Sequence, residues 1–115
     1  MAARFLESSY TSKRDIARIT TSNTATPLKE LPAGTELTYE GYVLQEITNE
    51  QTGEIFTSII VKDVDGKLYA TRSESFIRAL KEIIDICADD EEPIVLKIER
   101  LQSRAGHEFI TCALA

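Results

Sequence analysis

Alternating apolar and polar positions predict that the chain is mainly β, and the longest alternation runs from Glu36 to Thr48. Within it Tyr39 and Val43 share the side expected to face a core, and Tyr42 lies on the other side. Thirteen residues is long for a strand. A glycine in mid-strand, here Gly41, usually marks a bulge or a bend. The stretch therefore predicts a long, bent strand of the kind that serves two sides of a small barrel.

Shorter stretches of the same kind predict further strands at residues 13–21, 54–63, 67–71, 93–103 and 108–114. Asp65-Gly66 is a strong signal for a tight hairpin turn. Apolar residues recur at helical spacing only over residues 74–88, where Ser73 is a suitable N-cap. Residues 1–12 are polar and weakly periodic, so we expect a flexible N-terminal arm or a short helix there.

Taken in order, these elements are five principal strands with one helix between strands 3 and 4. That is the order of an OB-fold, a small Greek-key barrel. The expected organisation is therefore one OB-fold-like domain over residues 13–115. Another small β-barrel, or an α+β sheet with one covering helix, is the alternative architecture.

The chain has 115 residues and a net charge of −6, which argues against a simple nucleic-acid binder. The charge is uneven, since residues 36–66 hold one basic and seven acidic residues. No apolar run is long enough to span a bilayer, and the first residues lack the apolar centre of a secretory signal. A cytoplasmic protein is therefore expected. Cys87 and Cys112 have no metal-ligand spacing and are expected to be reduced, while the sequence leaves a disulfide between them open.

Little in the sequence suggests catalysis. The single histidine, His107, lies beside a turn, and no set of residues has the spacing of a nucleophile and its base. Phosphate-binding glycine loops are also absent from the sequence. We therefore expect a non-enzymatic protein without a metal or another cofactor.

Aromatic and basic residues on the face opposite the predicted core suggest binding of single-stranded nucleic acid. Such strands are held by bases stacking on rings and by a basic track for phosphates. The candidate rings are Tyr69, Tyr42 and Phe56. The position of Phe109, core or surface, is left open by the pattern. The candidate phosphate contacts are Lys62, Lys67, Arg72, Lys13, Arg14, Arg18, Lys97, Arg100 and Arg104.

Four short segments give the chain a resemblance to a known family. They are LKELPAGT at residues 28–35, DGKLY at residues 65–69, the helix led by Ser73 that ends in IIDI, and QSRAG at residues 102–106 leading into Phe109. In these segments and their spacing, over roughly residues 16–114, the chain resembles the small single-stranded DNA-binding proteins of tailed phages with protein-primed replication, the Bacillus podophage type.

The resemblance implies an acidic OB-fold protein that coats exposed strands during phage replication, with little sequence preference and no enzymatic activity. Stacking tyrosines are attributed to this family, and one matches Tyr69 by its place after the Asp-Gly turn. Others fall where this chain has residues 44–52, which contain no aromatic. Tyr42 and Phe56 lie nearby but do not match by position. The implied location is the cytoplasm of the host cell.

Two other functions remain open from the residues alone. An acidic OB-like domain could be a protein–protein interaction module or a DNA mimic with no nucleic-acid binding, which the acidic segment at residues 36–66 favours. Identical chains could also assemble through an edge strand. The partners expected from the resemblance are single-stranded DNA and replication proteins. No association with a membrane is expected. The protein is expected to be a monomer or a small homo-oligomer.

Overall fold

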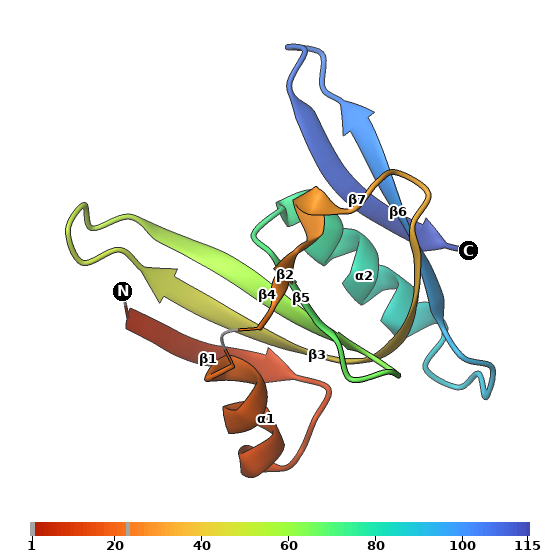
Figure 1. Ribbon diagram of the computed structural model, residues 1–115, viewed down its shortest axis with the longest axis horizontal. Helices are drawn as coiled ribbons and strands as arrows, with labels where there is room; N and C mark the ends of the chain where they lie inside the picture. The colour runs from red at the N-terminus through yellow and green to blue at the C-terminus, as the bar shows by residue number, and fades with distance from the viewer. Residues whose placement is uncertain (1, 23) are drawn as a thin grey trace.

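The computed structural model describes residues 2–22 and 24–115 and shows a mainly β protein whose curled sheet forms a half-barrel around one helix (Figure 1). This OB-like fold class is the one that the sequence predicts. In chain order the elements are β1 (Ala2–Ser8), α1 (Lys13–Thr20), β2 (Thr26–Pro27), the 3₁₀ helix η1 (Leu28–Glu30), β3 (Glu36–Thr48), β4 (Ile55–Asp63), β5 (Leu68–Thr71), α2 (Glu74–Ile86), β6 (Val95–Gln102) and β7 (Glu108–Leu114).

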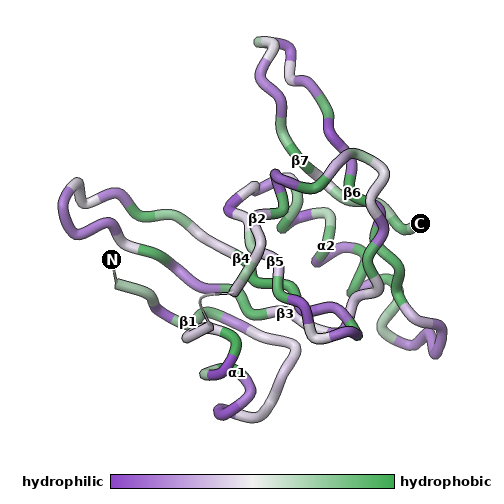
Figure 2. Tube along the Cα trace, in the orientation of Figure 1, coloured by the Kyte–Doolittle hydropathy of each residue, from purple (hydrophilic) through white to green (hydrophobic). Residues whose placement is uncertain are grey.

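The long strand β3 organises the sheet, and its predicted bounds are confirmed. Its first residues, 36–38, pair with β6, whereas residues 39–48 pair with β4. The β3–β4 hairpin and the β6–β7 hairpin extend in different directions, and we call them the two arms (Figure 1). The tips of both arms are hydrophilic, and apolar residues gather around α2 (Figure 2).

The predicted irregularity at Gly41 is confirmed, because the pairing of β3 with β4 shifts register between Tyr39 and Gly41. A bulge inserts one extra residue and so reverses which side chains face the core beyond it. Before the bulge Leu37 faces the main core, but after it Tyr42 packs against that core and Val43 lies in a second cluster. The prediction that Tyr42 lies on the face opposite the core is therefore wrong.

The segment predicted as a first strand, residues 13–21, is the helix α1. Ile16 and Ile19 lie three residues apart, so on a helix they share one face, and they pack in the second cluster with Val43 and Ile60. The side chain of Ser12 caps the helix by accepting a hydrogen bond from the backbone of Asp15 (3.4 Å). This amphipathic packing and capping outweigh the strand preference of the Ile and Thr residues. Consequently α1 covers the face of the sheet that the sequence suggested was free.

The N-terminal segment is also different from the expected arm or short helix, since Ala2–Ser8 forms strand β1. It pairs antiparallel with residues 43–48 of β3, along the edge that β6 leaves unpaired beyond residue 38. The open backbone groups of that edge provide the hydrogen bonds that hold β1 in place. Lys81 on α2 anchors its end through an ion pair to Glu7 (2.6 Å).

The remaining predictions hold in outline. Ser73 caps α2 by accepting a hydrogen bond from the backbone N–H of Phe76 (3.3 Å), and Phe76 and Leu80 are fully buried. The tight turn at Asp65-Gly66 is present, and Gly66 has the positive φ (88°) that favours glycine there. The OB-like path is thus β3–β4–β5–α2–β6–β7, with the helix between the third and fourth strands of that path.

The open side of the half-barrel is bridged by a segment that the sequence left as a loop and a turn. In the described part of the chain β5 pairs only with β4 and β2, and β7 only with β6. Residues 26–31, here called the plug segment, bridge the two sides. Its strand β2 pairs in parallel with β5, and its Leu28 is fully buried in the main core. The guanidinium of Arg100 on β6 donates to the carbonyls of Lys29 and of Leu31 (2.9 Å), which fixes the other side.

Candidate nucleic-acid interface

Three adjoining hollows share Arg72 in their lining. They lie where the plug segment, the C-terminal end of β5, the N-terminal end of α2 and the two arms meet. The largest, about 690 Å³, is lined by Lys29, Glu30, Thr71, Arg72, Ser73, Glu74, Ser75, Arg100, Glu108, Phe109 and Ile110. The second, about 420 Å³, reaches the β3–β4 arm through Ile55, Phe56 and Thr57, and the third, about 230 Å³, is bounded by Pro27 and Lys29. We call the three together the Arg72 groove.

At one end of the groove Arg72 lies over the ring of Phe56, with its guanidinium carbon 4.9 Å from the ring centroid. Phe56 follows the alternation of β4 and lies on the same face as Ile60, beyond the part that α1 covers, and Arg72 is the first residue after β5. Arg72 is exposed, and no described carboxylate lies within 4.0 Å of its guanidinium. A half-buried ring and an unpaired positive charge are therefore presented side by side.

The opposite wall of the groove comes from the β6–β7 arm. Phe109 is half-buried, and Leu101 lies directly opposite it across the two strands. Residues in such a pair share one face of the sheet. Of the pair, Phe109 lines the largest hollow and gives this wall a second ring available for contact. Glu108, next to Phe109, is held by Arg100 through an ion pair of 2.7 Å.

The charge within the groove differs from that of the whole chain. Four cations line it, Lys29, Arg72, Arg78 and Arg100, against three carboxylates, Glu30, Glu74 and Glu108. The first residues of α2 also line the largest hollow, and the N-terminal end of a helix carries partial positive charge. A chain of net charge −6 thus keeps a locally positive surface here.

Tyr69 and Lys67 line a separate hollow of about 490 Å³, together with Thr24, Thr26, Leu31, Gly66 and Leu68. Tyr69 packs against the main core, so the prediction that it lies on the opposite face is wrong. Its hydroxyl donates to Asp63 (3.4 Å), and burial raises the pKa of the phenol, with the Asp63 carboxylate adding to the effect. This hollow therefore offers one ring, that of Tyr69, and one exposed cation, Lys67.

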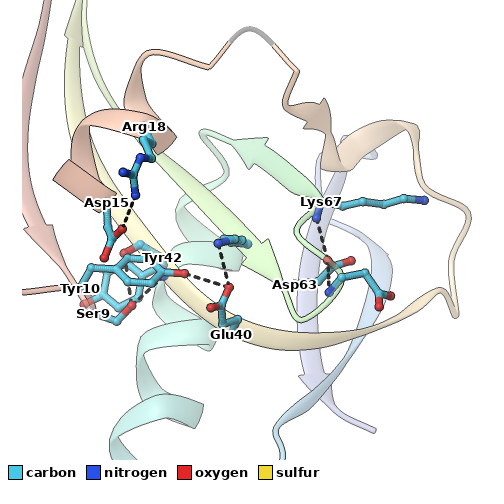
Figure 3. Close-up of polar contacts among 10 residues, drawn as sticks. Ser9, Tyr10, Asp15, Arg18, Glu40, Tyr42, Asp63 and Lys67 are labelled. Carbon is cyan, nitrogen blue, oxygen red and sulfur yellow. Dashed lines mark hydrogen bonds and ion pairs between the residues drawn. The ribbon is translucent and has the colours of Figure 1, made fainter. Parts of the chain in front are cut away.

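Tyr42 and Lys62 are engaged by contacts within the protein around the bulge. The Tyr42 hydroxyl donates to Glu7 (3.2 Å), and burial raises the pKa of this phenol to about 12. Lys62 forms an ion pair with Glu40 (3.4 Å), which also accepts a hydrogen bond from the hydroxyl of Tyr10 (3.3 Å; Figure 3). Neither candidate lines the Arg72 groove.

The ring of Tyr10 lies directly over Gly41, where a Cβ atom would come within 2.5 Å of the Cζ and hydroxyl of that ring. Gly41 is therefore required for this close approach of the Tyr10 ring. The hydrogen bond from Lys81 lowers the pKa of the Glu7 carboxyl. The charged and polar groups around Tyr42 and the bulge are thus bonded to one another within the protein and are not free to bind a ligand.

The other predicted cations are spread over the surface. Lys13 and Arg18 belong to α1, where Arg18 forms an ion pair with Asp15 (3.2 Å; Figure 3). Lys97 is exposed on β6, and Arg104 lies in the turn at the tip of the β6–β7 arm. Of all the predicted site residues, the structure brings Phe56, Arg72 and Arg100 together in the groove and places Arg104 on the arm that forms one wall.

The prediction missed Lys29 and Arg78 and left Phe109 undecided. Phe109 alternates with the buried Ile110 and Cys112, so the pattern of β7 could have placed it on the outer face. Lys29 follows no strand or helix pattern that a sequence reveals, because it belongs to a three-residue 3₁₀ helix.

Other features bear on the class of site. Among residues 2–22 and 24–115, no group of His, Cys, Asp and Glu is arranged to hold a metal ion. No helix within these residues is long and apolar enough to cross a membrane. The cysteines are unpaired, and burial raises the pKa of the Cys112 thiol to about 12, which makes it unreactive.

Comparison with protein families gave one finding. A family model described as phage single-stranded DNA-binding protein matches residues 11–115. No match was found among curated proteins or among solved structures.

Proposed function

Because the chain belongs to the family of phage single-stranded DNA-binding proteins, we propose that it coats exposed single strands during phage DNA replication and holds them in the Arg72 groove. Recognition in this proposal rests on stacking and on phosphate contacts, so it has little sequence preference. The proposed role needs no catalytic residue or cofactor and places the protein in the cytoplasm of the host cell, beside the replication proteins.

The observation that supports the groove most strongly is the stacked pair of Arg72 and Phe56. A base can stack on an aromatic ring or on a guanidinium plane, and an unpaired guanidinium also binds phosphate oxygens. Phe109 offers a second ring across the groove. OB-folds bind oligonucleotides on the face of their second and third strands, between the loops that join strands 1 to 2 and 4 to 5. Here those elements are β4, β5 and the tips of the two arms.

Within this proposal the other predicted residues have lesser roles. Arg104 contacts phosphates where the strand passes the tip of the β6–β7 arm. Tyr69 and Lys67 form a secondary contact for a longer strand, in their own hollow. Tyr42 and Lys62 are left out, because their polar groups are bonded within the protein.

A titration with fluorescent oligo(dT) over a range of salt concentrations tests the function. Binding should weaken as salt rises, with a slope of about −3 in a plot of log K against log salt, since Lys29, Arg72, Arg78 and Arg104 would neutralise four phosphates at about 0.7 each. Quenching of tyrosine fluorescence would report a strand that reaches Tyr69; no tryptophan masks it. Duplex DNA of the same length is the control.

Absence of oligo(dT) binding at low salt would remove the proposed function. If the protein then captured one replication protein in a stoichiometric complex, the alternative of an acidic interaction module would replace it. Equal affinity for duplex and single strand would remove the stacking mechanism, because the bases of a duplex are not free to stack on protein rings.

A further inference from the structure

We infer that Arg100 is a positioning residue of the binding groove, which acts by fixing Lys29 rather than by contacting DNA. The inference rests on the proposed function, because it assigns a role within the same groove. Arg100 lines the largest hollow together with Lys29, and its charge alone would suggest a phosphate contact. The hydrogen bonds that its guanidinium already makes within the protein indicate another role.

The guanidinium of Arg100 is occupied on both terminal nitrogens. Nη1 donates to Oε1 of Glu108 (2.7 Å), and Nη2 donates to the carbonyls of Lys29 and of Leu31 (2.9 Å). Its side chain is 27% exposed, against 55% for Glu108. A fork bonded in this way has its charge compensated by a carboxylate and has few N–H groups left for a phosphate.

Beyond Leu31 the chain is fixed to β6, where the N–H of Gly34 donates to the carbonyl of Ile98 (2.7 Å) and the N–H of Ile98 donates to that of Thr35 (2.8 Å), so Arg100 acts on the stretch before this point. Leu28 anchors one end in the main core, but η1 spans only three residues, with one backbone hydrogen bond from Leu31 to Leu28 (3.1 Å). Lys29 is exposed between these two fixed points. The two carbonyl contacts therefore decide the direction in which the Lys29 side chain leaves the backbone, and so whether its ammonium reaches the groove.

Arg100→Lys separates positioning from charge. A lysine keeps the positive charge but cannot donate in a planar fork to a carboxylate and two carbonyls at once. We expect Arg100→Lys to weaken oligo(dT) binding by roughly fivefold and to flatten the salt slope by about 0.7, the contribution of one phosphate contact. Lys29→Gln should have the same effect, and the double variant should be little weaker than either single one, since both changes remove the same contact.

Arg4→Lys is the matched control, because Arg4 is also paired with a carboxylate, Glu46 (3.3 Å), but lies on β1. Its affinity and slope should equal those of the unchanged protein. Wild-type affinity and slope in Arg100→Lys would overturn the inference, as would additive losses in the double variant, which indicate that Arg100 binds a phosphate itself. Thermal melting of each variant separates loss of binding from loss of folding.

A measurement on the unchanged protein covers the case in which Arg100→Lys does not fold. The side-chain Nε–H signal of Arg100 in a ¹⁵N-labelled sample should stay in place when oligo(dT) is added, while that of Arg72 moves. Movement of the Arg100 signal as large as that of Arg72 would overturn the inference. If the unchanged protein binds no oligo(dT), the proposed function fails; if it binds but the Arg100 results are contradictory, only the role of Arg100 fails.

Discussion

Replacing Phe56 by alanine is expected to weaken binding of oligo(dT) by roughly five- to 150-fold, which corresponds to the ~1–3 kcal/mol that a stacked base contributes. Phe56 supplies the ring at one end of the Arg72 groove, and Arg72 lies against it at 4.9 Å. Without the ring a base loses its stacking surface, and the guanidinium loses the support that holds its plane in the groove. Anisotropy of a labelled oligonucleotide measures the change.

Phe5→Ala is the control for this substitution. Phe5 is half exposed on β1, outside the groove and outside the part of the chain that matches the family model. The two variants remove the same side chain, so a general effect of losing a phenyl ring would appear in both. Equal affinities for Phe56→Ala, Phe5→Ala and the unchanged protein would show that no base stacks on Phe56.

Leu28→Ala is expected to lower the free energy of unfolding by about 2–5 kcal/mol, the range for a buried leucine whose removal leaves a cavity. Leu28 is fully buried in the main core although it belongs to a three-residue 3₁₀ helix. It is the residue by which the plug segment, paired with β5 and held by Arg100 of β6, reaches the main core. Urea unfolding followed by circular dichroism measures the loss.

The matched variant is Leu114→Ala near the end of β7, where the leucine is 54% exposed. A substitution at such a site typically changes stability by less than about 0.5 kcal/mol. If Leu28→Ala were as mild as Leu114→Ala, the plug segment would not be part of the core, and the account of how the half-barrel closes would be wrong.

The sequence predicts an element best when local pattern and tertiary packing agree. For β3 the alternation, the turn before it and the glycine in its middle all indicate one bent strand, and the structure contains it with the predicted bounds. For α2 the apolar stripe and the cap Ser73 agree in the same way. Each signal depends only on neighbours in the chain.

The predictions fail where an element depends on distant partners. Residues 13–21 have strand-like composition, and only the sheet face at Val43 and Ile60 makes a helix with Ile16 and Ile19 the better packing. The strand β1 depends on an edge of β3 that no local pattern reveals. The effect of the bulge is of the same kind, since one inserted residue moves Tyr42 to the core side without any change in the alternation.

For the candidate site, too, local pattern predicts some residues and the contacts between distant segments decide the others. Phe56 was predicted from strand alternation and Arg72 as one of several cations, and they meet because β4 and β5 are neighbours in a hairpin. Lys29 and Phe109 join them from segments far apart in the sequence, and this meeting depends on how the plug segment crosses the opening of the barrel. Tyr69, the stacking residue that the resemblance implies, lies in a different hollow from the Arg72–Phe56 pair, and its role there stays a prediction.

Mapping the backbone amide signals of a ¹⁵N-labelled sample during addition of oligo(dT) tests the central claim most directly, that the single strand lies in the Arg72 groove. The largest shifts should fall at Phe56, Arg72 and Phe109 and at Lys29 of the plug segment, with small shifts on α1. Shifts concentrated on α1, or at Lys67 and Tyr69 without the groove, would contradict it.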